Sequence, residues 1–214
     1  MRANPPCSIC SRASSRDSGE IYIDEQPLEL WDQSELAKTM AILTQSSNIS
    51  ARISVRDLVG FGRFPYCKGR LGPEDEAMVD KALAFMQLED LSSRFIDELS
   101  GGQRQRALIA MVLAQDTKYV LLDEPTNNLD IYHASHLMKS LRRLCDELNK
   151  TVVLVLHELN LASAYSDEIC VFKNGRLLKS GTPQEIVTED FLSSVYQVDF
   201  SVVQHHGRPL VIYS

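Results

Sequence analysis

Apolar residues in the second half of the chain occur in short, nearly continuous runs that are separated by longer amphipathic segments. Two runs cover residues 119–122 and 151–156, and residues 131–148 between them carry leucines at helical spacing. Strands that are buried on both faces have uninterrupted apolar runs, whereas amphipathic helices repeat every three to four residues. The alternation predicts a parallel sheet covered by helices on both faces, and therefore an α/β fold.

The first half of the chain is richer in helical patterns. The expected elements are a strand at 19–24, a helix at 34–39, a buried strand at 40–43 and helices from 55 to 115. Pro65 and the pair Gly72-Pro73 interrupt the helical region.

The last fifty residues predict smaller elements. Residues 168–173 and 176–180 flank Asn174-Gly175, the dipeptide typical of a tight β-hairpin. A short helix at 190–195 and one final strand rich in valine and isoleucine complete the expected elements.

Composition narrows the function classes. The 214 residues include 22 basic and 29 acidic side chains, and the net charge of −7 argues against a nucleic-acid partner. No run approaches the ~18 apolar residues of a membrane-spanning helix, and no secretory signal is evident, so we expect a cytoplasmic protein. The odd count of five cysteines does not suggest a disulfide framework, and Cys7 and Cys10 lack the second pair that a zinc site needs.

Asp123 and Glu124 directly follow the apolar run 119–122. Carboxylates at the end of a buried strand need a compensating cation or donors. Such an aspartate is well placed to hold Mg²⁺, and the adjacent glutamate to polarise an attacking water. A solvated acidic turn explains the same pattern equally well.

A second pattern, Leu-Ser-Gly-Gly-Gln at 99–103, lies directly before an expected helix. A serine N-cap followed by glycines leaves unpaired N–H groups at the positive end of the helix, where anions bind. An ordinary capped helix is the simpler interpretation. His157 and Gln45 each lie at the end of an expected strand, and alone a strand-end histidine is more often structural than functional.

The order of these patterns resembles the ATP-binding subunit of ABC transporters over residues 15–214. Gln45 matches the Q-loop, 99–103 the signature, Asp123-Glu124 the Walker B motif, 128–130 the D-loop and His157 the switch histidine. The resemblance implies a P-loop NTPase-like domain with a parallel core sheet and a helical subdomain at about 49–114. It also implies ATP as the nucleotide and Mg²⁺ as the cofactor.

The resemblance assigns a role to each site residue. Asp123 and Gln45 would position the metal, Glu124 would be the general base, and His157 would contact the γ-phosphate. The nucleotide-binding residues would be Gln45, Ser100, Gly101, Gly102, Gln103 and Asp130, with the signature closing over ATP held by a second, identical subunit. The expected partners are that subunit, a membrane permease and, indirectly, an extracytoplasmic siderophore-binding protein. The resemblance places the chain itself at the cytoplasmic face of the membrane.

A narrower resemblance concerns the cargo. Residues 55–59 and 62–66, and the short C-terminal stretch 183–213, are similar to importers of iron–siderophore, haem and cobalamin. Two alternatives stay open: a non-transport ABC ATPase of the translation or DNA-repair type, and a fragment without function.

One family motif has no match in the 214 residues: the phosphate-binding loop G-x-x-x-x-G-K-[ST]. We therefore expect negligible ATP hydrolysis by this chain. We also expect the strands at 119–122 and 151–156 to have uncovered flanks, which would make the chain poorly soluble.

Residues 1–14 form an aberrant N-terminus. The codons that can encode residues 1–10 permit a second reading in triplets that begin at the third base of each codon. This shifted frame can encode Ala-Gly-Lys-Ser-Thr-Leu-Leu-Asn-Met, so we hypothesise that the N-terminal residues are an out-of-frame translation of phosphate-loop DNA. A genuinely divergent N-terminus is the alternative, and the nucleotide sequence upstream of codon 20 decides between them.

Overall fold

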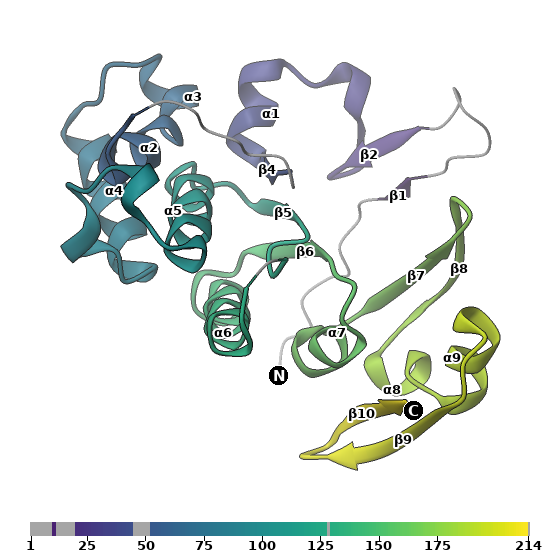
Figure 1. Ribbon diagram of the computed structural model, residues 1–214. Coiled ribbons are helices and arrows are strands. Elements are labelled where there is room, and N and C mark those ends of the chain that lie inside the picture. Colours follow the sequence, from purple (N-terminus) through teal and green to yellow (C-terminus); the bar gives the residue numbers. More distant parts are fainter. Residues whose placement is uncertain (1–9, 12–19, 45–51, 128, 214) are drawn as a thin grey trace. The chain divides into compact units, whose positions relative to one another are not determined.

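The computed structural model describes residues 10–11, 20–44, 52–127 and 129–213 (Figure 1). The chain divides into two compact units, Trp31–Val155 and the combination of Met1–Leu30 with Leu156–Ser214. None of the helices in the described ranges has the length and apolar character that crossing a membrane requires.

A three-stranded parallel sheet forms the centre of the unit Trp31–Val155. Its strands are β4 (Met40–Leu43), β5 (Tyr119–Asp123) and β6 (Thr151–Val155), in the order β4-β5-β6. The register places Ile42, Leu121 and Val153 side by side. The prediction of a parallel sheet is confirmed, with β6 ending one residue earlier than expected.

The two faces of this sheet differ in burial. Val120 and Leu122 point to a buried face, whereas Ile42 is 55% and Val155 51% exposed on the other. The expectation of helices on both faces is therefore wrong for the described residues. The expected uncovered flanks are also wrong for β5, because β4 and β6 pair with its two edges.

The exposed apolar face gives a testable expectation for solubility. Replacing Ile42 and Val155 by threonine should lower aggregation by light scattering roughly threefold, because an exposed apolar patch drives association. The free energy of unfolding should change by less than about 0.5 kcal/mol per site. The contrasting variant Val120→Thr places a hydroxyl on the buried face and should cost about 2 kcal/mol. Unchanged scattering would show that this face does not drive association.

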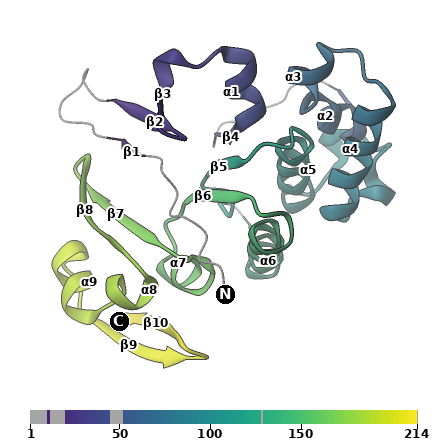
Figure 2. The same cartoon turned by 180° about the vertical axis from the view of Figure 1, so that it is seen from behind.

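Helices fill the segment between β4 and β5, as the sequence predicts. They are α2 (Val55–Phe61), α3 (Phe64–Cys67), α4 (Pro73–Phe85) and α5 (Gly101–Ala114), with 3-10 turns at Glu89–Leu91 and Ile96–Glu98. The short helix α1 (Gln33–Thr39) precedes β4. Figures 1 and 2 both show α2 and α4 beside α5.

A buried arginine ties these helices together. The Arg63 guanidinium lies 2.9 Å from Asp75 of α4 and donates to the carbonyl oxygen of Ala114, at 2.8 Å, at the end of α5. The Gly72 N–H, and then Arg63, lower the pKa of the Asp75 carboxyl. The contacts of this single side chain fix the end of α2 against both α4 and α5.

Helix α6 (Ile131–Leu148) has the predicted bounds. Asp130 caps its first turn, and Leu137, Leu141 and Leu144 form its buried stripe. The left-handed conformation of Asn149 ends the helix.

The other unit consists of small antiparallel sheets and short helices. The strands β1 (Cys10–Ser11), β2 (Ile21–Ile23) and β3 (Gln26–Pro27) form one sheet, followed by a 3-10 turn at Leu28–Leu30. The strands β7 (Ile169–Lys173) and β8 (Arg176–Gly181) form the expected hairpin, with positive φ at Asn174 and Gly175. The sequence did not predict α7 (Leu159–Tyr165) or α8 (Pro183–Ile186).

The C-terminal region differs from the expectation of one strand. It forms a hairpin of β9 (Phe200–His205) and β10 (Arg208–Tyr213), because His206 and Gly207 both have positive φ and turn the chain. The predicted helix is confirmed as α9 (Glu189–Tyr196). Leu192 and Val211 join these elements in a small hydrophobic core. Figure 2 shows α9 beside this hairpin.

Candidate functional site

Asp123 and Glu124 leave β5 in different environments. Asp123 is the exposed last residue of the strand, whereas Glu124 is half-buried. Glu124 has a φ of +49°, which is uncommon for a residue with a side chain, and its N–H donates to the carbonyl oxygen of Val155 at 3.1 Å. This bond to β6 holds the turn that carries the two carboxylates.

Asn127 holds the Glu124 side chain. Its amide Nδ2 donates to Glu124 Oε2 at 3.0 Å, and its backbone N–H donates to the Glu124 carbonyl oxygen at 3.1 Å. Asparagine commonly makes such local bonds in turns, so its position three residues after Glu124 is the signal that sequence reasoning missed. A carboxylate held in this way is oriented without being fully removed from solvent.

Ser100 is the N-cap of α5. Its Oγ accepts from the Gln103 N–H at 3.3 Å, and Gln103 Oε1 accepts from the Ser100 N–H at 3.0 Å. This is the capping box of an ordinary helix start, and it engages the Gln103 side chain. The N–H groups of Gly101 and Gly102 belong to the first turn, where the helix itself provides no acceptors.

Asp130 and Gly102 both contact His133. Asp130 Oδ1 accepts from the His133 N–H at 2.8 Å and lies 2.8 Å from His133 Nδ1. These bonds, the backbone one foremost, lower the pKa of the Asp130 carboxyl. A Cβ at Gly102 would lie 2.7 Å from His133 Cδ2. The structure thus joins two predicted site segments through a histidine that the motifs did not indicate.

The positions of two predicted site residues relative to this group are not described. His157 is exposed, follows β6 by two residues and belongs to the other unit, so its contact with the γ-phosphate stays a prediction. Gln45 lies outside the described residues, as do residues 1–9 and 12–19 of the N-terminal segment.

Comparison with known proteins decides the family. The family model described as ABC transporter matches residues 7–127, more than half of the chain. The chain belongs to the ABC transporter family. Nucleotide binding and ATP hydrolysis are properties of the ATP-binding members of this family, so the expected class of enzyme is confirmed.

Two relatives of this ABC transporter chain are petrobactin import ATP-binding proteins. YclP of Bacillus subtilis (strain 168) is 49% identical over 206 residues, which are 96% of this chain and 82% of YclP. FatE of Bacillus anthracis is 42% identical over 205 residues, with the same shares of the two chains.

A solved structure extends the comparison to the fold. The dimeric ATP-binding cassette MJ0796, in a post-hydrolysis state bound to ADP and Pi, is similar with a TM-score of 0.66 and 29% identity. The match covers 78% of this ABC transporter chain and 74% of MJ0796. The expected ABC ATPase fold is confirmed.

Proposed function

We propose that this chain corresponds to the ATP-binding subunit that powers import of an iron–siderophore complex through a membrane permease, at the cytoplasmic face of the membrane, and that its own 214 residues are inactive in ATP hydrolysis because they contain no phosphate-binding loop. The observation that carries the proposal is the 49% identity to a petrobactin import ATP-binding protein over nearly the whole chain. The two relatives described above are import proteins, which favours transport over a role in translation or DNA repair.

Glu124 is the general base in this proposal. The hydrogen bond from Asn127 to Oε2 orients the carboxylate, which would accept a proton from the attacking water. The exposed Asp123 carboxylate, with Gln45, would hold Mg²⁺, which neutralises phosphate charge when bound. The described residues contain no group of three His, Cys, Asp or Glu side chains that could enclose a metal. One carboxylate and one amide oxygen, from Asp123 and Gln45, suit Mg²⁺, which keeps several waters and substrate phosphates as its other ligands.

The nucleotide would lie between two identical subunits. The dimeric state of the similar cassette MJ0796 supports this arrangement. Ser100, Gly101, Gly102 and Gln103 present the positive end of α5, which favours a phosphate of the partner's ATP. Asp130 would approach the same nucleotide from the start of α6, and His157 would contact the γ-phosphate.

Residues 15–214 form a partial ATP-binding domain in this proposal, and its helical subdomain at about 49–114 contacts the permease. Phe61 and Phe64 support the docking role, because they are 57% and 61% exposed at the junction of α2 and α3. Exposed aromatic side chains that are close in sequence mark protein interaction sites. The extracytoplasmic siderophore-binding protein acts through the permease and does not contact this chain.

Capture by a permease tests the proposal. The tagged chain is incubated with membranes that contain the Bacillus subtilis petrobactin permease and lack YclP. We expect specific capture of the permease, and about tenfold weaker capture by the variant Phe61→Ser/Phe64→Ser, since two exposed aromatic anchors are worth at least 1.4 kcal/mol together.

The matched control is Phe172→Ser, which removes an aromatic side chain of similar exposure, 59%, from β7. It should leave capture unchanged. Capture of ribosomes instead of the permease, or equal loss in the control, would contradict the proposed function.

A further inference from the structure

His133 occupies the space between two segments of the proposed nucleotide site. We propose that His133 is a positioning residue that holds the start of α5 and the start of α6 at a fixed separation, so that Ser100–Gly102 and Asp130 reach the partner's nucleotide together. The role in catalysis rests on the proposed function, whereas the contact itself does not.

The contact with α5 is a direct one. A Cβ built at Gly102 would lie 2.7 Å from Cδ2, 2.9 Å from Cγ and 3.3 Å from Cβ of His133. The first two distances are shorter than real Cβ contacts, so the imidazole lies where a side chain at position 102 would be. Gly102 is buried, whereas nothing lies within 4 Å of the equivalent position at Gly101. The second glycine of the signature is therefore the one that contacts the ring.

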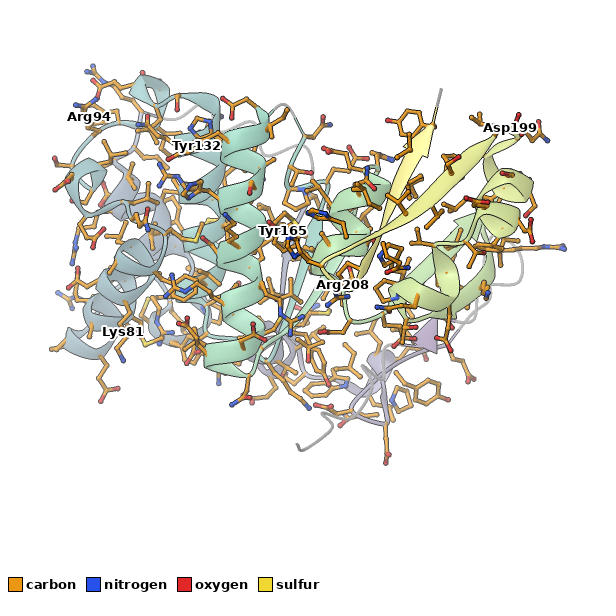
Figure 3. The ribbon with its side chains drawn as sticks, turned by 90° about the horizontal axis from the view of Figure 1, so that it is seen from below. Lys81, Arg94, Tyr132, Tyr165, Asp199 and Arg208 are labelled. Carbon is orange, nitrogen blue, oxygen red and sulfur yellow. The ribbon has the colours of Figure 1, made fainter. Side chains whose placement is uncertain are left out.

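The contact with α6 sets the orientation of the ring. Nδ1 lies 2.8 Å from Asp130 Oδ1, and an ionised carboxylate can only accept, so Nδ1 carries the proton. The ring of Tyr132, labelled in Figure 3 at the start of α6, packs edge-on against His133 with centroids 5.3 Å apart. The imidazole is thus fixed by a hydrogen bond on one edge and by Gly102 on the other.

This arrangement couples the two segments mechanically. Asp130 accepts from the His133 backbone N–H as well as from its ring, so a displacement of the Asp130 carboxylate moves the imidazole. Because the ring abuts Gly102, the first turn of α5 must follow or separate from it. Only 37% of the His133 side chain is exposed, which is consistent with a wedge between elements.

Amide hydrogen exchange in the 214-residue chain tests the contact. In His133→Ala, the Gln103 and Arg104 amides, which are bonded to Ser100, should exchange about tenfold faster than in the unmodified chain. In His133→Asn the same two amides should exchange at the original rate, because the asparagine side-chain amide can replace both Nδ1 and the ring atom that faces Gly102. His136→Ala is the matched control, since His136 lies on the same helix and contacts Tyr132. Unchanged exchange in His133→Ala overturns the inference.

A mixed-subunit ATPase assay tests the consequence for catalysis. The chain is mixed with YclP that carries arginine at the position aligned with Ser100, so that YclP provides the phosphate loop and this chain the signature. His133→Ala should lower kcat about tenfold with the KM for ATP unchanged, and His133→Asn should retain at least half of the activity. A merely structural loss would lower the fraction of active mixed dimer and would not be rescued by asparagine.

The two measurements separate the inference from the proposed function. A mixture that fails to hydrolyse ATP with the unmodified chain counts against the proposed function, and hydrogen exchange still decides the contact. An active mixture in which His133→Ala has normal kcat overturns the positioning role.

Discussion

The 214-residue chain should hydrolyse ATP at less than about a thousandth of the rate of an intact relative such as YclP. The chain keeps Asp123, Glu124 and His157, but none of its residues form a G-x-x-x-x-G-K-[ST] loop. That loop supplies the N–H cradle and the lysine for the β- and γ-phosphates. Because losing even one transition-state donor costs about 10²–10³ in rate, losing the whole cradle should cost at least as much.

Phosphate release from the purified chain, compared with YclP at equal concentration, measures this effect. The control is Glu124→Gln, which removes the proposed general base and should leave the background unchanged. Activity well above background that disappears in Glu124→Gln would contradict the prediction, because it would require phosphate binding by other residues. Activity that persists in Glu124→Gln would indicate a contaminating ATPase.

The elements that local patterns specify were predictable residue by residue. Helix α6 has the predicted bounds because Asp130 caps its start, its leucines recur at helical spacing, and Asn149 adopts the left-handed conformation that ends it. The strand β4 and the hairpin at Asn174-Gly175 were equally well specified. In each case the determining residues are neighbours in the sequence.

Features that depend on tertiary contacts were not predictable. Apolar residues such as Ile42 and Val155 predicted coverage on both faces of the sheet, because the pattern along a strand does not indicate which helices pack there. The C-terminal hairpin was missed because its turn uses His206-Gly207, a less specific signal than Asn-Gly.

The candidate site shows the same division. The order of the motifs predicted Asp123, Glu124 and Asp130 as site residues, but not the side chains that contact Glu124 and Asp130. Asn127 was accessible in principle as a local turn residue, whereas the contact between His133 and Gly102 joins positions 31 residues apart. Spacing alone carries no information on such a contact.

Gly62→Ala should be among the most destabilising substitutions in the chain. A Cβ at this position would lie 2.0 Å from the carbonyl oxygen of Met111 and 3.1 Å from the Cβ of Ala114, both in α5. A helix backbone cannot yield as a flexible side chain can, so α2 and α5 must separate. Overpacking of this kind should cost about 3 kcal/mol. In a chain of this length that corresponds to a fall of about 6–12 °C in Tm, which thermal unfolding measures.

Two other glycines provide matched controls. Gly101→Ala meets nothing within 4 Å, and Gly60→Ala meets only Leu71 Cδ1, at 3.2 Å, which can move. Both variants should stay within about 0.5 kcal/mol of the unmodified chain. If Gly62→Ala matched them, α2 and α5 would not be in close contact in solution. Because Phe61 and Phe64 flank this contact, Gly62→Ala should also weaken permease capture, although it removes no exposed aromatic side chain.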